Sequence, residues 1–367
     1  MKLYNFGAGP AIMPSEVVAA TAQAVTNFEG MGLSLMELGH RTPQFKAVLA
    51  EAQQLMRELL NVPDNFSILF LGGGARLQFD MVPMNFLNHH AQFIDSGHWA
   101  HQAMQAAQRW GKVSEAASSR EEGYHTLPNE IMIDTTADYL HITANNTIYG
   151  TEMRNDLKSP IPVVADMTSD ILSRPIDFSH YGMVYGGAQK NLSMAGVTFV
   201  IVNNDWLNSI KRDLPAMLDY RVHVAHDSMY NTPPTLAIYT ALQTLRWVKA
   251  QGGVTEMQRR AQQRANLLYA EIDRNSLFRC TVDAGSRSLM NCCFVLNEPY
   301  QQLEDAFLQF ALDRGFYALK GHRLVGGFRA SIYNAMPIEG VQALVHCLQE
   351  FFPCWHRRTR RPPALRA

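Results

Sequence analysis

Short apolar runs that end at polar or glycine-rich turns follow an N-terminal region of mostly helical pattern. In residues 15–62, apolar side chains recur at helical spacing, at Phe45, Val48, Leu49, Ala52, Leu55 and Leu59. The later runs have strand length and occupy residues 66–71, 92–95, 139–143, 161–165, 183–185 and 197–202. Because these runs alternate with helical segments, we expect an α/β domain with a mostly parallel sheet. In such sheets, ligands bind beyond the carboxyl ends of the strands.

A second region with a different pattern begins near residue 255. Helical segments at residues 257–272, 302–314 and 338–352 are interspersed with strand-like runs at 291–296 and 329–333. We expect residues 15–254 to form a large domain, residues 1–14 and 255–356 a smaller α+β domain, and residues 357–367 a flexible basic tail. The polar face of the first of these helices is expected to carry Arg259, Arg260, Arg264 and Glu271. A cleft between two lobes is a usual site for a small molecule.

The composition is typical of a soluble enzyme and argues against several other classes of protein. Charged residues make up 18% of the chain and hydrophobic residues 47%, with a formal net charge of −1. This balance gives no overall attraction to nucleic acid or anionic membranes, and no apolar run is long enough to predict a membrane span. Five cysteines without paired spacing argue against a disulfide framework or a metal site. Since the N-terminus also lacks a signal-peptide pattern, the sequence favours a cytoplasmic protein.

The segment Met183-Val-Tyr-Gly-Gly-Ala-Gln-Lys190 places a lysine among small, uncharged residues just after an apolar run. Most lysines are solvated surface charges, but an amine in such surroundings loses its proton easily because burial disfavours the charged form. Asp166 ends the preceding apolar run, where it could also simply cap a helix. A neutral lysine amine attacks aldehydes, and an acid on a neighbouring strand end suits a pyridinium nitrogen. The pair therefore predicts pyridoxal phosphate (PLP) as a cofactor.

The turn Gly72-Gly-Gly-Ala-Arg76 follows a strand-like run and lets backbone amides approach an anion. It lacks the Gly-Lys-Ser/Thr of a P-loop and the spacing of the dinucleotide fingerprint. Alone it indicates only a strand-to-helix turn, but together with Lys190 it predicts a cup for the phosphate of PLP. Trp99 lies in a later strand-to-helix connection, where it either fills the core or stacks on a pyridine ring.

Two His-Arg pairs, His40-Arg41 and His322-Arg323, and Arg329 lie in sparsely charged surroundings. Any one of them could form a surface ion pair, but arginine forks bind carboxylates and phosphates in a bidentate way. As a set they predict a strongly anionic substrate that has both a carboxylate and a phosphate. The arginines of the C-terminal tail could touch nucleic acid, but a frayed, solvated terminus is the favoured interpretation.

From about residue 4 to residue 352, the chain resembles the phosphoserine aminotransferases, a family of class V, fold-type I PLP-dependent enzymes. The matching segments include Asn5-Phe-Gly-Ala-Gly-Pro-Ala, Met36-Glu-Leu-Gly-His-Arg41, Gly-Gly-Gly-Ala-Arg76-Leu-Gln-Phe, Ser173-Arg-Pro-Ile-Asp177, Ala-Gln-Lys190-Asn, Asn231-Thr-Pro-Pro-Thr and Lys-Gly-His322-Arg. The resemblance implies a large PLP-binding domain with a mostly parallel sheet flanked by helices, and a smaller α+β C-terminal domain.

The resemblance also implies roles for the candidate residues. Lys190 would bind PLP covalently and carry protons, Asp166 would pair with the ring nitrogen, and Trp99 would stack on the ring. Further contacts with the cofactor are implied for Ala75, Arg76, Thr147, Thr168 and Gln189 and, from the neighbouring subunit of a homodimer, for Asn231 and Thr232. Arg329 would bind the substrate α-carboxylate. The phosphate or the side-chain carboxylate would be bound by His40, Arg41, Arg76, His322 and Arg323, some of them across the dimer interface.

The implied reaction is a ping-pong transfer of the amino group from L-glutamate to 3-phosphohydroxypyruvate, a phosphorylated 2-oxo acid. It yields O-phospho-L-serine and 2-oxoglutarate in serine biosynthesis, and bacterial members also act on the phosphorylated four-carbon analogue in pyridoxine biosynthesis. Ala75 and Leu77 depart from many bacterial members, which have glycine at both positions. Ala75 keeps its amide, so phosphate binding should survive if its φ is negative, while Leu77 adds bulk. No family role extends to the basic tail.

Three alternatives remain open. The first is another class V aminotransferase, of the alanine-glyoxylate or serine-pyruvate type. The second is a cysteine desulfurase, which needs a mobile nucleophilic cysteine, whereas Cys292 and Cys293 lie in an apolar, strand-like run that favours inert thiols. The third is a nucleic-acid-binding protein that uses the tail, and the near-zero net charge argues against it.

Overall fold

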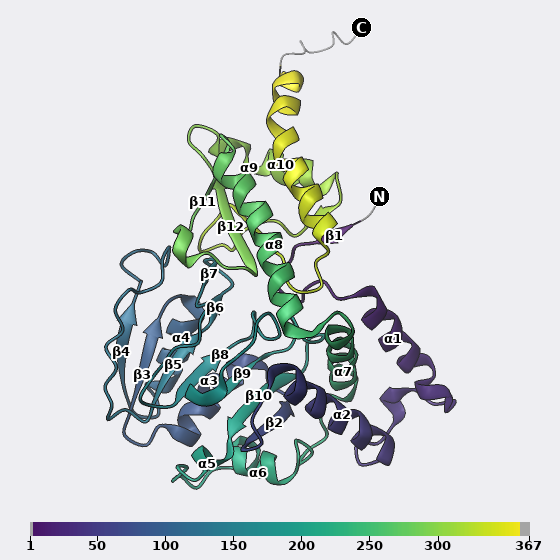
Figure 1. Ribbon diagram of the computed structural model, residues 1–367, viewed down its shortest axis with the longest axis vertical. Coiled ribbons are helices and arrows are strands. Elements are labelled where there is room, and N and C mark those ends of the chain that lie inside the picture. Colours follow the sequence, from purple (N-terminus) through teal and green to yellow (C-terminus); the bar gives the residue numbers. More distant parts are fainter. Residues whose placement is uncertain (1–2, 360–367) are drawn as a thin grey trace.

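The structure is a computed structural model that describes residues 3–359, with side chains through Phe351. Its centre is a seven-stranded sheet in the order β2-β10-β9-β8-β5-β3-β4 (Figure 1). These strands are β2 (Phe66–Leu71), β3 (His90–Asp95), β4 (Lys112–Ser118), β5 (Tyr139–Thr143), β8 (Val163–Asp166), β9 (Tyr181–Gly187) and β10 (Thr198–Asn203). All neighbours are parallel except the two pairs that β10 forms with β2 and β9. The prediction of an α/β fold with a mostly parallel sheet is confirmed.

Helices cover both faces of this sheet, so its strands are buried on both sides. One layer contains α1 (Ser15–Thr26), α2 (Pro43–Leu60) and α7 (Thr235–Ala250), and the other contains α3 (Gly74–Phe86), α4 (His98–Ala107), α5 (Asn204–Leu207) and α6 (Tyr220–Ala225). Within β2, Ile68 and Phe70 pack into the core of the first layer, whereas Leu69 and Leu71 pack into that of the second. This double burial explains why the strands are continuous apolar runs rather than alternating ones.

The region between α1 and α2 corrects the expectation that residues 15–62 are mostly one helical stretch. Two short 3-10 turns, η1 (Phe28–Gly30) and η2 (Leu35–Glu37), replace helix there. Gly30 and Gly32 both have φ of 77°, which an α-helix cannot contain. Helix α2 then restarts at Pro43, with the hydroxyl of Thr42 accepting a hydrogen bond from Phe45 N at 3.4 Å.

A smaller lobe lies beside the large sheet and uses both ends of the described chain (Figure 1). It contains a three-stranded antiparallel sheet of β11 (Phe278–Cys280), β12 (Asn291–Leu296) and β14 (Phe328–Ser331), and a parallel pair of β1 (Tyr4–Asn5) and β13 (Phe316–Tyr317). Its helices are α8 (Gly253–Arg274), α9 (Glu304–Leu312) and α10 (Ile338–Thr359). The short elements of the described chain that have not yet been named come from both parts of the chain. They are β6 (Asn145–Asn146), β7 (Thr151–Glu152), η3 (Phe178–His180), η4 (Ala216–Leu218), η5 (Ala284–Ser286) and η6 (Gln301–Leu303).

Helix α8 joins the two lobes, because its first turns pack into the large core and its later turns into the smaller one. Met257 belongs to the core of the α1 layer, and Leu268 belongs to the smaller core. The expected polar face of this helix is partly wrong, since Arg264 and Glu271 are buried at 2% and 3% exposure. The two cores are separate, and the domain division near residue 255 stays a prediction.

Helix α10 continues to Thr359, beyond the predicted end at residue 352 and into the first residues of the predicted tail. Residues 360–367 of that tail, and residues 1–2 of the predicted smaller domain, lie outside the described residues.

Candidate active site

The carboxyl ends of the parallel strands converge on one cavity of about 320 Å³. Strand β5 leads into its wall, β8 ends at it, and β9 leads into the turn that carries Lys190. The lining residues are Gly73, Gly74, Ala75, Arg76, Phe79, Trp99, Thr143, Asn145, Thr147, Asp166, Thr168, Ser169, Gln189 and Lys190. The cavity therefore occupies the place where an open α/β sheet binds its ligand.

The glycine-rich turn between β2 and α3 forms one end of the cavity. Gly73 and Gly74 have φ of 92° and 69°, a left-handed backbone that favours glycine. Ala75 is not among the described residues with positive φ, so its side chain adds no backbone strain and the expectation for its amide holds. The amides of Ala75 and Arg76 lie in the first turn of α3, where backbone N–H groups have no acceptor within the helix. Together with the helix dipole they make a cradle for an anion.

Leu77 lies against this turn. A Cβ built on Gly73 would be 2.3 Å from Leu77 Cδ2 and 2.9 Å from its Cβ. The Leu77 side chain, which replaces the glycine of many bacterial members, therefore packs against Gly73 in the turn that forms the anion cradle.

Asp166 is held at the end of β8 with 5% exposure. Its Oδ1 accepts hydrogen bonds from Thr168 N at 2.9 Å and from Thr168 Oγ1 at 2.5 Å. Burial raises the pKa of Asp166, and the hydrogen bonds from Thr168 act in the opposite direction. A protonated ring nitrogen in the cavity would stabilise this buried carboxylate in its charged form.

Lys190 faces Thr147, and its Nζ donates a hydrogen bond to Thr147 Oγ1 at 2.5 Å. Burial lowers the pKa of Lys190 to about 8; the Asp166 carboxylate opposes this effect and the Arg329 guanidinium adds to it. A substantial share of the amine is therefore neutral at mildly alkaline pH. The N-terminal segment lies against this side chain, since a Cβ on Gly9 would be 3.3 Å from Lys190 Cγ and Ala11 N donates to Gln189 O at 3.0 Å.

Trp99 lies in the first turn of α4 and not in the preceding connection. The guanidinium carbon of Arg76 is 5.1 Å from the centre of the Trp99 ring, a distance typical of a cation–π contact. Both residues line the cavity, so the indole is available as a flat wall for an aromatic ligand.

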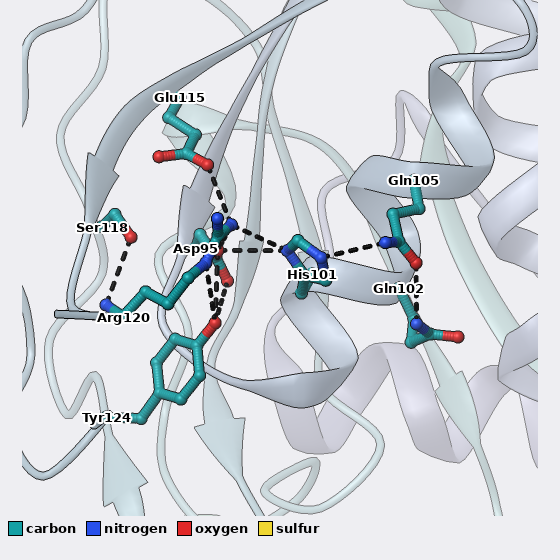
Figure 2. A network of polar contacts seen from close by, with 8 residues as sticks. All are labelled: Asp95, His101, Gln102, Gln105, Glu115, Ser118, Arg120 and Tyr124. Atoms are coloured by element: carbon teal, nitrogen blue, oxygen red, sulfur yellow. Dashed lines mark hydrogen bonds and ion pairs between the residues drawn. The ribbon is translucent and has the colours of Figure 1, made fainter.

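A polar network centred on Asp95 anchors the start of α4 (Figure 2). Asp95 is fully buried at the end of β3. Its Oδ2 accepts from Arg120 Nε at 3.0 Å and lies 3.2 Å from His101 Nδ1, and its Oδ1 accepts from Tyr124 OH at 3.1 Å. Arg120 Nη2 also contacts Asp95 and donates to Glu115. Because His101 belongs to α4, this network fixes the helix that presents Trp99.

A cluster of basic side chains lies beside the cavity and joins the two lobes. Arg329 Nη1 donates to Thr147 O at 3.2 Å, which brings this arginine close to Lys190. Burial and then the charge of Arg329 lower the pKa of His322, with smaller effects from His98 and Arg323. Burial lowers the pKa of His98 as well, with Arg76 as its strongest charged neighbour. These groups make the surroundings of the cavity strongly favourable for anions.

Three comparisons with known proteins agree with this geometry. The family model described as Aminotransferase class-V matches residues 3–344. The phosphoserine aminotransferase of Phocaeicola vulgatus is 57% identical over 352 residues, which cover 96% of this chain and 99% of the relative. The solved structure of phosphoserine aminotransferase from Bacillus circulans subsp. alkalophilus is 42% identical, covers 98% of this chain and 99% of that chain, and has a TM-score of 0.93. The chain belongs to the phosphoserine aminotransferase family.

A PLP-bound phosphoserine aminotransferase from Trichomonas vaginalis is a further structural relative, 35% identical, with coverage of 95% of this chain and 100% of that one and a TM-score of 0.89. The cavity described above fits the same cofactor. It offers amides for a phosphate, a buried carboxylate for a ring nitrogen, an indole face and a lysine of lowered pKa. This phosphoserine aminotransferase family member is therefore a PLP-dependent aminotransferase, as the sequence predicted.

Seven of the predicted site residues do not line the cavity of the single chain. Three of them, His322, Arg323 and Arg329, belong to the basic cluster beside it. The other four are His40, Arg41, Asn231 and Thr232. Arg41, Asn231 and Thr232 are exposed, and His40 is partly buried. Burial and then the neighbouring Arg41 lower the pKa of His40, and its Nε2 has no hydrogen-bond partner among the described residues. For this family member, the roles implied for these four residues require a second subunit and stay predictions.

Some residues of the phosphoserine aminotransferase cavity were missed from the sequence. Phe79, Thr143, Asn145 and Ser169 line it, and His98 belongs to the basic cluster beside it. Thr143 is the last residue of β5 and Asn145 comes just after it, so the rule that ligands bind at strand ends was a usable signal for both. Asn145 Nδ2 also donates to Asn291 Oδ1 at 2.7 Å, which ties the cavity wall to β12 of the smaller lobe.

The two neighbouring cysteines of β12 bear on the desulfurase alternative. Cys292 and Cys293 are buried, and burial raises the pKa of both thiols, that of Cys293 to about 12. Neither therefore has the accessible thiolate that a desulfurase in this superfamily would need. Within the described part of this phosphoserine aminotransferase, no group of three His, Cys, Asp or Glu residues could hold a metal ion. None of its described helices is both long and apolar enough to cross a membrane.

Proposed function

We propose that this chain transfers the amino group of L-glutamate to 3-phosphohydroxypyruvate and forms O-phospho-L-serine and 2-oxoglutarate. The observation that carries the proposal is one cavity that combines Asp166 and Lys190 with an amide cradle and lies beside a cluster of cationic side chains. Relatives that share up to 57% of their residues with this chain over nearly its whole length are named phosphoserine aminotransferases, and these names support the same reaction. We further infer that the product serves serine biosynthesis and that the protein is cytoplasmic.

The proposed mechanism assigns proton transfer to Lys190 and charge stabilisation to Asp166. When bound, PLP supplies an electron sink for the negative charge that develops at the substrate α-carbon. Asp166 would keep the ring nitrogen of the cofactor protonated. The amides of Ala75 and Arg76, with Gln189, would hold its phosphate, and Thr147 and Thr168 would donate hydrogen bonds to it. The neutral Nζ of Lys190 would accept the proton from the substrate α-carbon and later return it. Trp99 supplies one wall and keeps water from the ring.

Substrate binding is proposed to use the basic cluster. Arg329, close to Lys190 through its contact with Thr147, is placed for the substrate α-carboxylate. His322, Arg323 and Arg76 are assigned to the phosphate or to the glutamate side-chain carboxylate. Burial and the charge of Arg329 lower the pKa of His322 in the chain without substrate. We propose that His322 donates a hydrogen bond to the same anionic group.

We also propose a homodimer with composite active sites. Four large apolar side chains on α1 and on the segment between α1 and α2 are well exposed: Val18 at 52%, Met31 at 42%, Leu33 at 45% and Met36 at 61%. An exposed apolar group of this kind is typical of a protein–protein interface. His40 and Arg41 follow directly on the same segment, and Asn231 and Thr232 are likewise exposed. The proposal is that the partner's His40 and Arg41 reach the substrate and the partner's Asn231 and Thr232 reach the cofactor phosphate.

A coupled assay tests the substrate assignment. Glutamate is supplied with 3-phosphohydroxypyruvate, pyruvate or glyoxylate, and 2-oxoglutarate formation is measured. We expect kcat/KM for the phosphorylated acceptor to exceed that for the others by at least about a hundredfold, because only that acceptor pairs a phosphate with the arginines. Equal values would contradict the assignment and would favour an alanine-glyoxylate or serine-pyruvate aminotransferase. A fourth arm with the phosphorylated four-carbon 2-oxo acid measures the activity expected for pyridoxine biosynthesis.

A further inference from the structure

A second hollow, separate from the Lys190 cavity, lies where the two lobes meet. It has a volume of about 560 Å³ and is lined by residues 12–16, by one face of the end of α7 and the first half of α8, and by residues 334–339. None of these residues lines the Lys190 cavity. We call it the Arg264 groove.

Arg264 is the buried cation of this groove. Its side chain lies on α8 with 2% exposure, and its Nε donates to Ile332 O at 3.2 Å. Its Nη2 has no hydrogen-bond partner within residues 3–351, and no ion pair within that part of the chain includes Arg264. Burial and the charge of Arg260 lower the pKa of Arg264 only to about 10, so the guanidinium stays charged at neutral pH. A buried charge without a counter-charge is costly for the folded state.

The neighbouring charged residues do not supply the missing counter-charge. Glu256 is already paired with Arg259 at 2.7 Å and with Arg260 at 2.8 Å. Glu16 and Glu339 also line the groove, but both are exposed. Water could satisfy the free N–H groups of Arg264, but it would leave the charge uncompensated.

Two further features of the groove suit an anion. The N-termini of α1 and of the 22-residue α10 both border it, and helix N-termini carry partial positive charge and unpaired backbone amides. Asn334, which is 4% exposed, lines the same groove, and its Oδ1 has no partner among the described residues. A hydroxyl on the bound anion, as in hydrogen phosphate, would satisfy this acceptor.

We propose that the Arg264 groove binds a small oxyanion, a phosphate or carboxylate group, through the guanidinium of Arg264. The site is independent of the proposed transamination, because its residues take no part in the Lys190 cavity. Asn334 N donates to Asn191 Oδ1 at 3.0 Å, so the groove and the turn after Lys190 share a structural connection.

Thermal unfolding of the PLP-loaded protein in different sodium salts at constant ionic strength tests the proposal. Relative to chloride, inorganic phosphate should raise the Tm of the wild-type protein by about 2 °C or more, because a ligand that binds only the folded state stabilises it. Arg264→Gln should lose most of this rise, whereas Arg279→Gln, an exposed arginine of β11 outside the groove, should keep it. Equal rises in wild type and Arg264→Gln would overturn the proposal, since the anion would then act elsewhere, and so would no rise in the wild type.

A second variant keeps the test valid if Arg264→Gln does not fold. Gln263 is exposed and lines the same groove, so Gln263→Glu adds a competing carboxylate without a change in the core. Its phosphate-dependent rise in Tm should be at most half that of the wild type, and a full rise would contradict the proposal. Parallel arms with sulfate and acetate distinguish the source of the anion. Phosphate should raise the Tm more than sulfate, because only hydrogen phosphate offers a hydroxyl to Asn334 Oδ1. A rise in acetate as well, again lost in Arg264→Gln, would show that the groove also accepts carboxylates.

Discussion

At the scale of single residues, burial and neighbouring charges act on the pKa of Lys190 in opposite directions. Burial and Arg329 favour its neutral form, and Asp166 favours its charged form. The net result is a pKa of about 8 for Lys190 in the chain without cofactor, well below that of an ordinary lysine. The neutral amine, which reacts with an aldehyde, therefore becomes abundant as the pH rises through 8 rather than through about 10.4.

This pKa predicts how the cofactor-free protein takes up PLP. The rate of uptake, followed by absorbance after mixing, should rise steeply from pH 7 and level off near pH 9. Nα-acetyl-lysine, measured under the same conditions, corrects for the ionisation of PLP itself, and its rate should still rise at pH 10. A protein rate that follows the model compound up to pH 10 would show that the pocket does not lower the pKa of Lys190.

The contact between Gly73 and Leu77 predicts a coupled effect of two substitutions. Gly73→Ala forces a left-handed backbone on an L-residue and drives its Cβ into Leu77, so PLP should bind about tenfold more weakly or worse. Adding Leu77→Gly removes the collision, and the double variant should recover part of the loss. The dissociation constant of PLP for the four proteins of this double-mutant cycle measures the coupling. Strictly additive effects would mean that Leu77 does not restrict the turn.

At the scale of elements, the strands with continuous apolar runs could be predicted from the sequence. Elements whose positions depend on the rest of the fold or on backbone angles at glycines could not. Strands β2, β5, β8 and β10 are apolar because both faces are covered, and their runs were recognised. Strand β4 was missed because it lies at the edge of the sheet and has mostly exposed or partly exposed side chains. The break between α1 and α2 was missed because it depends on the positive φ of Gly30 and Gly32 within a segment of helical composition.

The anchor of α4 predicts that a change outside the cavity alters the surroundings of the cofactor. Arg120→Met removes the cationic partner of the buried Asp95, so the protein should lose about 2 kcal/mol of unfolding free energy. The loss should be smaller than for a fully buried pair, because the Arg120 side chain is 47% exposed. Since the same network holds His101, the start of α4 and Trp99 should shift.

Two measurements check this prediction for α4. Urea unfolding gives the change in stability, and circular dichroism in the absorption band of bound PLP reports the asymmetry around its ring. Arg109→Met, at an exposed position just after α4, is the matched control and should leave both unchanged. If the Arg120→Met protein is less stable but has the circular dichroism of the wild type in the PLP band, the Asp95 network stabilises the fold without positioning Trp99.

At the scale of the whole molecule, the candidate site divides into a part that one chain completes and a part that it does not. Asp166, Lys190, Arg76 and Trp99 could be predicted because they follow strand ends, and the sheet brings such positions together. Gly9 and His98 were not singled out, because their closeness to the site depends on how the N-terminal segment and the smaller lobe pack. The family resemblance implied that His40 and Arg41 bind the substrate, in part across a dimer interface. The structure of one chain does not test this role.

The proposed shared site predicts complementation between two inactive variants. Lys190→Ala and Arg41→Ala proteins should each have little activity. After unfolding and refolding as a mixture, half of the dimers would be mixed, and each mixed dimer would have one site with both native residues. Activity should therefore return to roughly a quarter of the wild-type value. If refolded mixtures show only the sum of the separate activities, Arg41 acts within its own chain.

The pairing of β1 with β13 has a consequence for the order in which the protein forms during its synthesis. Phe6 belongs to the smaller core together with residues from α8 onward, so the segment that contains β1 can pack only after β13 has left the ribosome. The strands and helices of the large sheet are complete well before that point and can fold first. The segment with Gly9 settles against Lys190 only when β1 has paired with β13, so a nascent chain cannot be active before β13 has been synthesised.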